Sequence, residues 1–329
     1  MKITAIVRTY KRLEYLKQCL ASISCQSYEN WELIVFDDSG ELDVHESIDV
    51  FKKHHTDKRV VYITSFTPYD LFMKSFFYQA SLSEGDIIFR IDDDDILPSY
   101  TFDKLVKMYS ENENIDFSFG SSCIFDDTSK KVSSIVYNKS PLEFKNKSAW
   151  APYTIPNNNP WNEPFYWIDN YYDEPMPYTS IIHASKGNQM CLLQSYSFRK
   201  KSIKIEDLEK ISLPLSTLCD DLEFLGSLEY LGLTYAVVKN ILTLTRNHYN
   251  LKITNVSRIA QSGLNWPDEL CRVRDKVDCL RPNDFVTSNL IIGNENETED
   301  NLQIILDDTF DIINEKVKSI WIIKNEQNL

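Results

Sequence analysis

The first 110 residues of this 329-residue chain alternate short apolar runs with stretches of helical periodicity. The apolar runs are continuous and rich in β-branched residues, which is typical of strands that are buried on both faces of a sheet. We expect strands at residues 3–7, 33–36, 60–63 and 87–91, and helices at 13–23, 43–53, 69–82 and 102–109. Repeated strand–helix units predict an α/β fold whose mostly parallel sheet is flanked by helices.

The pattern changes after residue 110. Further strands are expected within 117–137, at 190–193 and at 235–238, and a helix is expected to start near residue 220. Residues 148–180 are rich in Pro, Asn and aromatic side chains and have no regular period, so they predict a long loop over a site. From about residue 252 the pattern is mainly helical, and an apolar stripe over 302–320 predicts an amphipathic helix that packs on its own domain or on a partner subunit.

The composition excludes several classes of protein. The chain has 35 Lys and Arg against 49 Asp and Glu and no dense basic patch, so nucleic-acid binding is not expected. No apolar run approaches the roughly 20 residues that span a bilayer, and the run at 3–7 is too short for a signal peptide. We expect a cytoplasmic protein with no integral membrane segment, and peripheral association with a membrane stays open. The seven scattered cysteines lack a C-x-x-C pair and predict neither a disulfide framework nor a zinc site.

Four consecutive aspartates, residues 92–95, follow directly after the strand expected at 87–91. Adjacent carboxylates repel one another unless a positive group compensates them. A hard divalent cation would do so, because Mg²⁺ takes oxygen ligands and is commonly shared with substrate phosphates. Ligands of open α/β sheets bind at the carboxyl ends of the strands, so we favour a metal–phosphate site over a solvated acidic turn. An EF-hand is excluded, because Ile96 lies near the position that requires Gly.

Two further acidic pairs follow the same logic. Asp37 and Asp38 end the second expected strand and would lie beside residues 92–95 at one edge of a parallel sheet. A turn or a helix N-cap is the alternative for this pair. Asp220 and Asp221 precede a helical stripe, so they lie at a helix N-terminus, where the dipole stabilises anions. Capping of that helix and service as a general base are both compatible with this position.

Nine aromatic residues fall between positions 150 and 178, among them Trp161 and Trp167. Aromatic faces beside Asn, Asp and Glu suit sugar rings, which present both C–H surfaces and hydroxyls. We therefore assign Trp161 and Trp167 to acceptor binding. Packing of the loop onto the domain is the alternative explanation.

Three ordered blocks of sequence resemble the family-2 glycosyltransferases, which share the GT-A fold. The blocks are Ala-Ile-Val-Arg-Thr-Tyr-Lys-Arg at 5–12, the segment from Gln-Ser-Tyr to Val-Phe-Asp-Asp at 26–38, and Gly-Asp-Ile-Ile-Phe-Arg-Ile followed by the four aspartates at 85–95. Further along, Asp-Asp at 220–221 occupies the place of a common Glu-Asp pair. The segment at 246–250 resembles the Arg–His segment that closes the catalytic region.

The resemblance covers about residues 1–250 and implies a domain organisation. The expected fold is α/β, a GT-A Rossmann-like mostly parallel sheet flanked by helices, with a mainly helical C-terminal extension at 251–329. The catalytic domain at 1–250 would contain a nucleotide-sugar-binding half at 1–125 and an aromatic acceptor loop at 148–180. A homo-oligomer formed through the C-terminal helices is one expectation for the extension.

The family's pattern, carried over by position, implies roles for the strand-end residues and for the third acidic pair. Thr9 and Asp38 would contact the nucleoside, with Asp37 as the alternative to Asp38. Asp221 would be the catalytic base that deprotonates the acceptor hydroxyl. Asp220 would be its supporting neighbour.

The resemblance also implies the cofactors. Asp92 and Asp94 would form the D-x-D motif, with Asp94 as the direct metal ligand and Asp92 nearer the ribose, and Asp93 is assigned with them to donor binding. His248 is assigned to the metal or the diphosphate, and a structural role is its alternative. The cation would be Mn²⁺ or Mg²⁺, and a UDP-sugar is the favoured donor. The helix expected at 69–82 departs from the family because it lacks the usual Arg, with Lys74 as the candidate substitute.

Together these patterns predict a metal-dependent inverting glycosyltransferase. It would move a sugar from a nucleoside-diphosphate sugar to a hydroxyl of a saccharide or related acceptor, in surface polysaccharide or glycoconjugate synthesis. Two alternatives stay open at this point. One is a non-catalytic carbohydrate-binding or scaffold protein on a degenerate GT-A fold, and the other is a phosphoryl-transfer enzyme.

Overall fold

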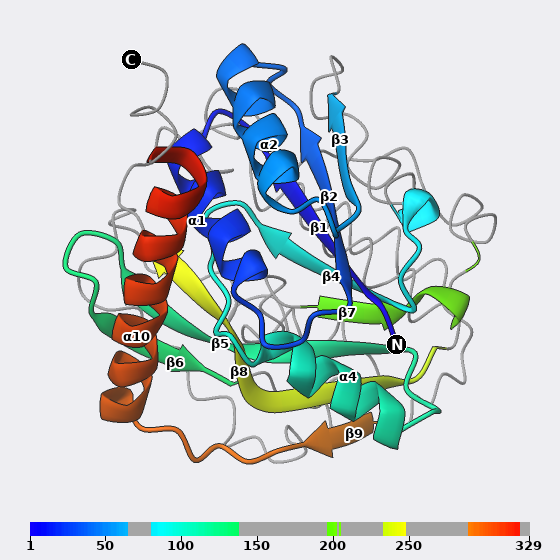
Figure 1. Ribbon diagram of the computed structural model, residues 1–329. Helices are drawn as coiled ribbons and strands as arrows, with labels where there is room; N and C mark the ends of the chain where they lie inside the picture. Colours follow the sequence, from blue (N-terminus) through cyan, green and yellow to red (C-terminus); the bar gives the residue numbers. More distant parts are fainter. Residues whose placement is uncertain (65–79, 138–195, 203, 205–232, 248–288, 323–329) are drawn as a thin grey trace, which may run out of the picture.

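The computed structural model describes residues 1–64, 80–137, 196–202, 204, 233–247 and 289–322. In these residues nine strands form one mixed sheet in the order β3-β2-β1-β4-β7-β5-β8-β9, and β6 pairs with β5. Figure 1 shows the helices α1, α2, α4 and α10 arranged along this sheet. None of the helices in the described part of the chain is both long and apolar enough to cross a bilayer.

The N-terminal half of the sheet is parallel and confirms all four strands expected there. These strands are β1 (Ile3–Thr9), β2 (Trp31–Asp37), β3 (Val60–Thr64) and β4 (Ile87–Asp92). The central strand β1 pairs in parallel with β2 on one side and with β4 on the other. Each strand runs one or more residues beyond its expected apolar core, so polar residues form the strand ends.

Three helices cover one face of the parallel half: α1 (Leu13–Ser24), α2 (Leu42–His54) and α4 (Thr101–Glu111). Along β1, Ala5 and Val7 pack with these helices, whereas Ile6 packs into a second core on the opposite face. Both faces of β1 are therefore buried, which explains why its sequence is continuously apolar. The helix expected at 69–82 lies largely outside the described residues.

The second half of the sheet is mixed. It contains β5 (Phe117–Asp126), β6 (Val132–Val136), β7 (Tyr196–Arg199, followed by the short 3₁₀ helix Lys200–Ser202), β8 (Tyr235–Asn247) and β9 (Asn289–Ile292). Strand β7 runs antiparallel between β4 and β5, while β8 and β9 are parallel to β5 and β8 respectively. Two features differ from expectation: β8 continues to residue 247 instead of ending near 238, and β9 is a strand in a segment expected to be mainly helical. The strand expected at 190–193 lies outside the described residues.

The predicted amphipathic helix is α10 (Glu299–Val317), and the π-helix η6 (Lys318–Ile322) follows it. Figure 1 shows α10 alongside α1. Its apolar stripe, for example Leu306 and Phe310, is buried in a cluster with β5 and β8. The indole N–H of Trp321 donates to the carbonyl of Ser47 in α2 at 3.0 Å. The helix therefore packs on its own domain, while a homo-oligomer and a domain boundary at 250 stay predictions.

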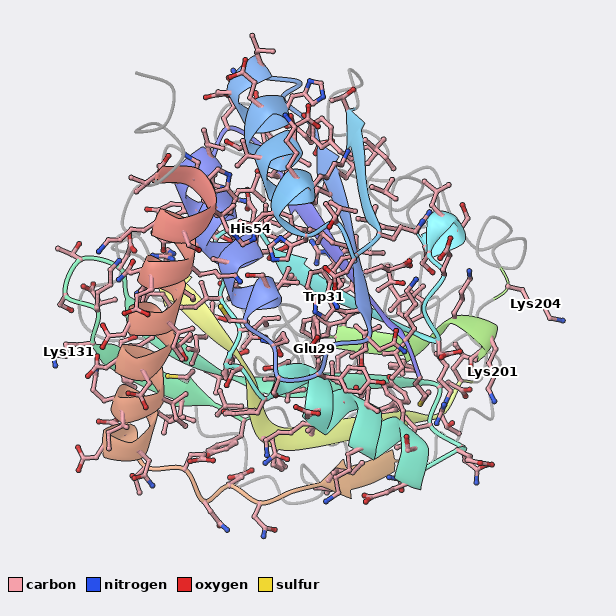
Figure 2. All side chains as sticks on the ribbon, viewed as in Figure 1. Glu29, Trp31, His54, Lys131, Lys201 and Lys204 are labelled. Carbon is pink, nitrogen blue, oxygen red and sulfur yellow. The ribbon has the colours of Figure 1, made fainter. Side chains whose placement is uncertain are left out.

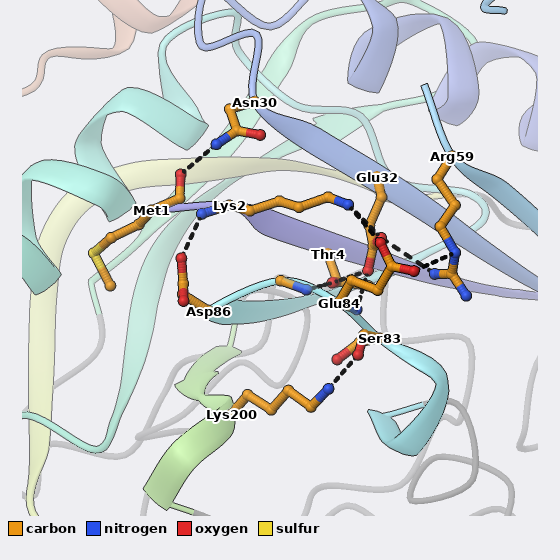
Figure 3. Close-up of polar contacts among 11 residues, drawn as sticks. Met1, Lys2, Thr4, Asn30, Glu32, Arg59, Ser83, Glu84, Asp86 and Lys200 are labelled. Carbon is orange, nitrogen blue, oxygen red and sulfur yellow. Dashed lines mark hydrogen bonds and ion pairs between the residues drawn. The ribbon is translucent and has the colours of Figure 1, made fainter. Parts of the chain in front are cut away.

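A buried carboxylate joins the amino ends of the parallel strands (Figure 3). Glu32 of β2 accepts hydrogen bonds from the Thr4 hydroxyl and the Glu84 amide, both at 2.5 Å. The Lys2 ammonium lies 2.8 Å and the Arg59 guanidinium 3.2 Å from its second oxygen. A buried charge is tolerated when it is paired and hydrogen-bonded, as Glu32 is here. This network ties β1, β2 and the start of β3 to the turn before β4.

The same turn approaches β1 without an intervening side chain. The Thr4 hydroxyl accepts the amide N–H of Gly85 at 3.0 Å. A Cβ at position 85 would lie 2.5 Å from the Thr4 hydroxyl oxygen and 2.6 Å from the Thr4 backbone nitrogen, so the contact requires glycine. The turn therefore fixes where β4 begins against β1, and thereby which β1 residue lies opposite Asp92.

We expect Glu32→Gln to lower the free energy of unfolding by about 3 kcal/mol, because it leaves Lys2 and Arg59 beside a neutral partner. Burial raises the pKa of Glu32, but the hydrogen bonds from Lys2, Thr4 and the Glu84 amide outweigh it and hold that pKa below its usual range. The ionised Glu32 therefore stabilises the fold above the unfolded-state pKa of about 4.3, and this stabilisation is lost as the pH falls through the lower folded-state pKa.

Urea unfolding at pH 7 and at pH 3 measures both effects. The variant should differ most from wild type at pH 7. The control is Glu84→Gln, whose exposed side chain also pairs with Lys2 and Arg59 and should cost less than about 1 kcal/mol. Equal losses for the two variants would contradict the role assigned to burial.

Candidate functional site

The carboxyl ends of β1, β2 and β4 bring the predicted acidic residues to one edge of the sheet. Thr9 pairs with Asp37 across β1 and β2, and Arg8 pairs with Asp92 across β1 and β4. The amide of Asp38 donates to the carbonyl of Thr9 at 3.0 Å. The two acidic groups therefore lie at the same edge of the sheet, on either side of β1, because the three strands are parallel.

Asp93 is the buried centre of this edge. Its carboxylate accepts the Thr9 hydroxyl at 2.6 Å and lies 2.5 Å from Nη2 of Arg12. Burial raises the pKa of Asp93, while the charge of Arg12 and the hydrogen bond from Thr9 oppose this rise without cancelling it. Asp93 therefore holds Thr9 and Arg12 in place from inside the protein.

Asp92 and Asp94 are the two acids of the run that retain access to solvent. Their side chains are 33% and 15% exposed, whereas those of Asp93 and Asp95 are buried. Nη2 of Arg90 lies 3.0 Å from the Asp92 carboxylate in an ion pair, and Asp94 pairs with Nη1 of Arg12. The first and third carboxylates of the run are therefore the two that reach solvent.

Arg246, near the end of β8, holds the turn that contains Asp94 and Asp95 from the interior of the protein. The backbone N–H of Arg246 donates to Asp95 at 3.0 Å, and its Nε donates to the backbone carbonyl of Asp94 at 2.8 Å. Its remaining nitrogens reach Gln18 at 2.7 Å and Asp127. The Arg246 side chain is fully buried, so it fixes the main chain of the turn at Asp94 and Asp95 to α1, to the turn after β5 and to β8.

Asp127 completes this layer. It accepts from the Tyr15 hydroxyl at 2.8 Å and from the Lys130 ammonium at 2.6 Å. Burial raises the pKa of Asp127, but hydrogen bonds from Lys130, Tyr15 and Arg246 outweigh it and lower that pKa to about 2. The ring of Phe310 in α10 lies 5.9 Å from the Arg246 guanidinium, so the C-terminal helix packs against the layer that supports the acidic turn.

The two acids that end β2 have different surroundings. Asp37 is fully buried and accepts from the amide of Ser39 at 2.8 Å, from its hydroxyl at 2.5 Å, and from the Tyr62 hydroxyl at 2.8 Å. These contacts match the turn alternative for Asp37. Asp38 pairs with Nε of Arg8 at 2.5 Å. Asp37 thus shapes the turn that presents Asp38.

Charge compensation at this edge comes from arginines, which the sequence analysis did not assign. Arg12 pairs with Asp93 and Asp94, and Arg90 pairs with Asp92. From the sequence, a divalent cation alone was expected to compensate the four carboxylates. One signal was available: Arg12 follows the first expected strand by a few residues, so it had to lie at the edge where that strand ends.

The acidic edge fits a divalent cation that is shared with a ligand. Asp92 and Asp94 offer the carboxylate oxygens that Mg²⁺ accepts. Within the described residues, no group of three or more His, Cys, Asp or Glu side chains is arranged to hold a metal ion. A cation bound here would take further oxygens from a ligand such as a diphosphate and from water, as Mg²⁺ commonly does.

The remaining predicted site residues lie outside the described part of the chain. They are Asp220, Asp221, His248, Trp161 and Trp167, together with Lys74. Their roles therefore stay predictions.

Comparisons with known proteins point to one family. The model of glycosyl transferase family 2 matches residues 4–166. A curated relative from Rickettsia bellii (strain RML369-C), described as an uncharacterized glycosyltransferase, is 29% identical over 134 residues. That match covers 41% of this chain and 19% of the relative, about a fifth of its length.

Solved structures of S. aureus TarS 1-349 share the fold. The complex with UDP-GlcNAc has a TM-score of 0.54 and 13% identity, and covers 95% of this chain and 72% of that one. The complex with UDP has a TM-score of 0.53 and 13% identity, and covers 94% of this chain and 71% of that one. The mostly parallel sheet flanked by helices is therefore a GT-A architecture, as the sequence analysis expected.

We expect Arg246→Met to lower the free energy of unfolding by about 3–5 kcal/mol, because it leaves buried polar groups around Asp127 and Asp94 without their charged donor. Lys130→Met is the matched control, since Lys130 contacts the same Asp127 from an exposed position and should cost less than about 1 kcal/mol. Urea unfolding at pH 7 measures both. Equal losses of stability in the two variants would contradict the claim that the buried Arg246 supports this layer more strongly than Lys130 does.

Proposed function

Residues 4–166 belong to glycosyl transferase family 2, and from that premise we propose that this protein transfers a sugar from a nucleoside-diphosphate sugar to a hydroxyl of a saccharide or related acceptor. The observation that carries the proposal is that Asp38, Asp92 and Asp94 lie at the carboxyl ends of β2 and β4, the two parallel strands that flank β1. Ligands of open α/β sheets bind at this edge. The proposed reaction inverts the anomeric centre and depends on a divalent cation.

The proposed donor is a UDP-sugar. The shared fold with TarS, which was solved with UDP-GlcNAc and with UDP, supports a nucleotide sugar in general and is compatible with uridine. Asp38 contacts the nucleoside, and Asp92, the most exposed acid of the run, lies nearer the ribose. Thr9 is proposed to contact the nucleoside beside Asp38, and its hydroxyl is held by the buried carboxylate of Asp93 at 2.6 Å.

Asp94 is the proposed metal ligand, and His248 is its proposed companion at the metal or the diphosphate. A divalent cation bound at Asp94, Mn²⁺ or Mg²⁺, would offset the negative charge that develops on the leaving nucleoside diphosphate. Asp221 takes the proton from the acceptor hydroxyl, whose oxygen then attacks the anomeric carbon from the face opposite the diphosphate. Asp220 supports Asp221, and Trp161 and Trp167 bind the acceptor.

The proposed context is surface polysaccharide or glycoconjugate synthesis in the cytoplasm, with peripheral attachment to a membrane as an option. The acidic composition agrees with the absence of a nucleic-acid partner. The apolar stripe of α10 is buried against its own domain. A homo-oligomer formed through residues 251–329 would therefore have to use other surfaces of this segment.

We expect Asp94→Asn to abolish sugar transfer while the protein stays folded, because Asp94 is partly exposed and the amide cannot supply a charged ligand. Release of nucleoside diphosphate from nucleotide sugars in Mn²⁺, with and without acceptor, is the measurement. Glu46→Gln, an exposed acid on α2, is the control and should retain full activity. Full wild-type activity in excess EDTA would contradict the cation, and no release by wild type with any donor would favour a non-catalytic binding protein.

We expect Asp221→Asn to lower kcat by about 10²–10⁴-fold, the range contributed by a positioned general base. Donor Kd should change little, because the base faces the acceptor. Asp220→Asn is the matched control and should be milder, since successive residues of a helix point about 100° apart. Both variants are compared for kcat and for donor binding. An inactive Asp220→Asn beside a normal Asp221→Asn would move the base by one residue.

A further inference from the structure

Arg12 occupies the acidic edge from the turn between β1 and α1. Its Nη2 lies 2.5 Å from Oδ1 of Asp93, its Nε donates to Oδ2 of Asp93 at 3.2 Å, and its Nη1 pairs with Asp94. One guanidinium therefore bridges two neighbouring carboxylates with three nitrogens. The Arg12 side chain is only 17% exposed. Its ion pairs are therefore less screened by solvent than those on a protein surface.

This position places a positive charge on the carboxylate that is proposed to hold the metal. A divalent cation that approached Asp94 without a nucleotide would meet the guanidinium at close range and would have to displace it. Within the described residues, the acidic edge included, no three His, Cys, Asp or Glu side chains are arranged to hold a metal ion without a further ligand. Binding of a cation alone is therefore opposed by the protein itself.

The guanidinium has an alternative partner only when a nucleotide is present. Arginine binds phosphate oxygens in the same bidentate geometry that it uses for carboxylates. A diphosphate at this edge would supply oxygens for Arg12 and, at the same time, oxygens that complete the coordination of a cation. Arg246 cannot serve in this way, because it is fully buried and bound to the carbonyl of Asp94, Asp127 and Gln18.

We propose that Arg12 makes loading of the divalent cation depend on the donor. Without a nucleotide, Arg12 neutralises Asp94 and keeps divalent cations off the acidic edge. With the donor diphosphate, Arg12 turns to the phosphate oxygens and frees Asp94 for the cation. The inference rests on the proposed function, because it takes the ligand to be a nucleoside diphosphate. Arg12 is thus a positioning residue that couples two binding events.

The test measures binding, not turnover. The electron paramagnetic resonance signal of free Mn²⁺ gives the affinity of wild type and Arg12→Gln for Mn²⁺, with and without UDP. In wild type, UDP should tighten Mn²⁺ binding at least tenfold, within the usual range of coupling between sites. Arg12→Gln should bind Mn²⁺ alone about tenfold more tightly than wild type, and should lose most of the coupling. It should also bind UDP more weakly when no metal is present.

Two charge-removing controls separate Arg12 from general electrostatics. Arg8→Gln removes a neighbouring guanidinium that pairs with Asp38, and Lys201→Gln removes a charge at the periphery of the molecule (Figure 2). Both should bind Mn²⁺ alone nearly as wild type does. Arg12→Lys keeps the charge and should keep Mn²⁺ binding weak, which provides a second variant if Arg12→Gln is poorly folded by circular dichroism.

Several outcomes would overturn the inference. These are equal affinities of wild type and Arg12→Gln for Mn²⁺ alone, an equal gain in Arg8→Gln, or tight Mn²⁺ binding by wild type without UDP. Failure of the proposed function gives a different result. In that case wild type would bind no UDP under any condition, while the comparison of Mn²⁺ alone between wild type and Arg12→Gln would still report on Arg12.

Discussion

Four carboxylates stand in succession at the carboxyl end of β4, and each is met by a guanidinium group or a hydrogen-bond donor. Arg90 pairs with Asp92, Arg12 bridges Asp93 and Asp94, and the amide of Arg246 donates to Asp95. Isolated buried charges would be too costly to keep, so the geometry of the edge depends on these pairings. Because Arg12 lies in the turn after β1, Arg90 on β4 and Arg246 on β8, these pairings also fix the ends of those three strands to one another at the site.

The opposite end of the sheet sets the position of that edge. Glu32 gathers Thr4, Lys2 and Arg59, and the Gly85 turn packs directly on β1. A strand that shifted by one residue would turn every side chain to the other face, so pinning the start of β4 decides which acids reach the ligand side. Two polar networks at the two ends of the parallel strands therefore act together, and the apolar cores between them supply most of the burial.

The C-terminal helix belongs to the support of the site. Phe310 packs against the Arg246 guanidinium and against Phe125, and Trp321 reaches back to α2. The sequence showed the amphipathic stripe of α10 and its period, but a stripe does not name the surface that it covers. Strand β9 was not predicted for a related reason. Its four residues are too few to show a strand pattern within a segment that reads as helical, and pairing with β8 decides their conformation.

The sequence by itself determined the parallel half of the sheet, the helices α1, α2 and α4, and the acidic residues at the strand ends. Local periodicity is enough for this, because buried strands and amphipathic helices leave different spacings of apolar residues. Only the tertiary structure decided which charges meet. Arg12 and Asp94 are 82 residues apart in the chain, and Arg246 is farther still from Gln18. Such pairings depend on strand order and register, which no local pattern records. The tertiary structure also decided how Asp37 and Asp38 differ. Asp37 shapes a turn and Asp38 pairs with Arg8, because folding brings different neighbours to each of them.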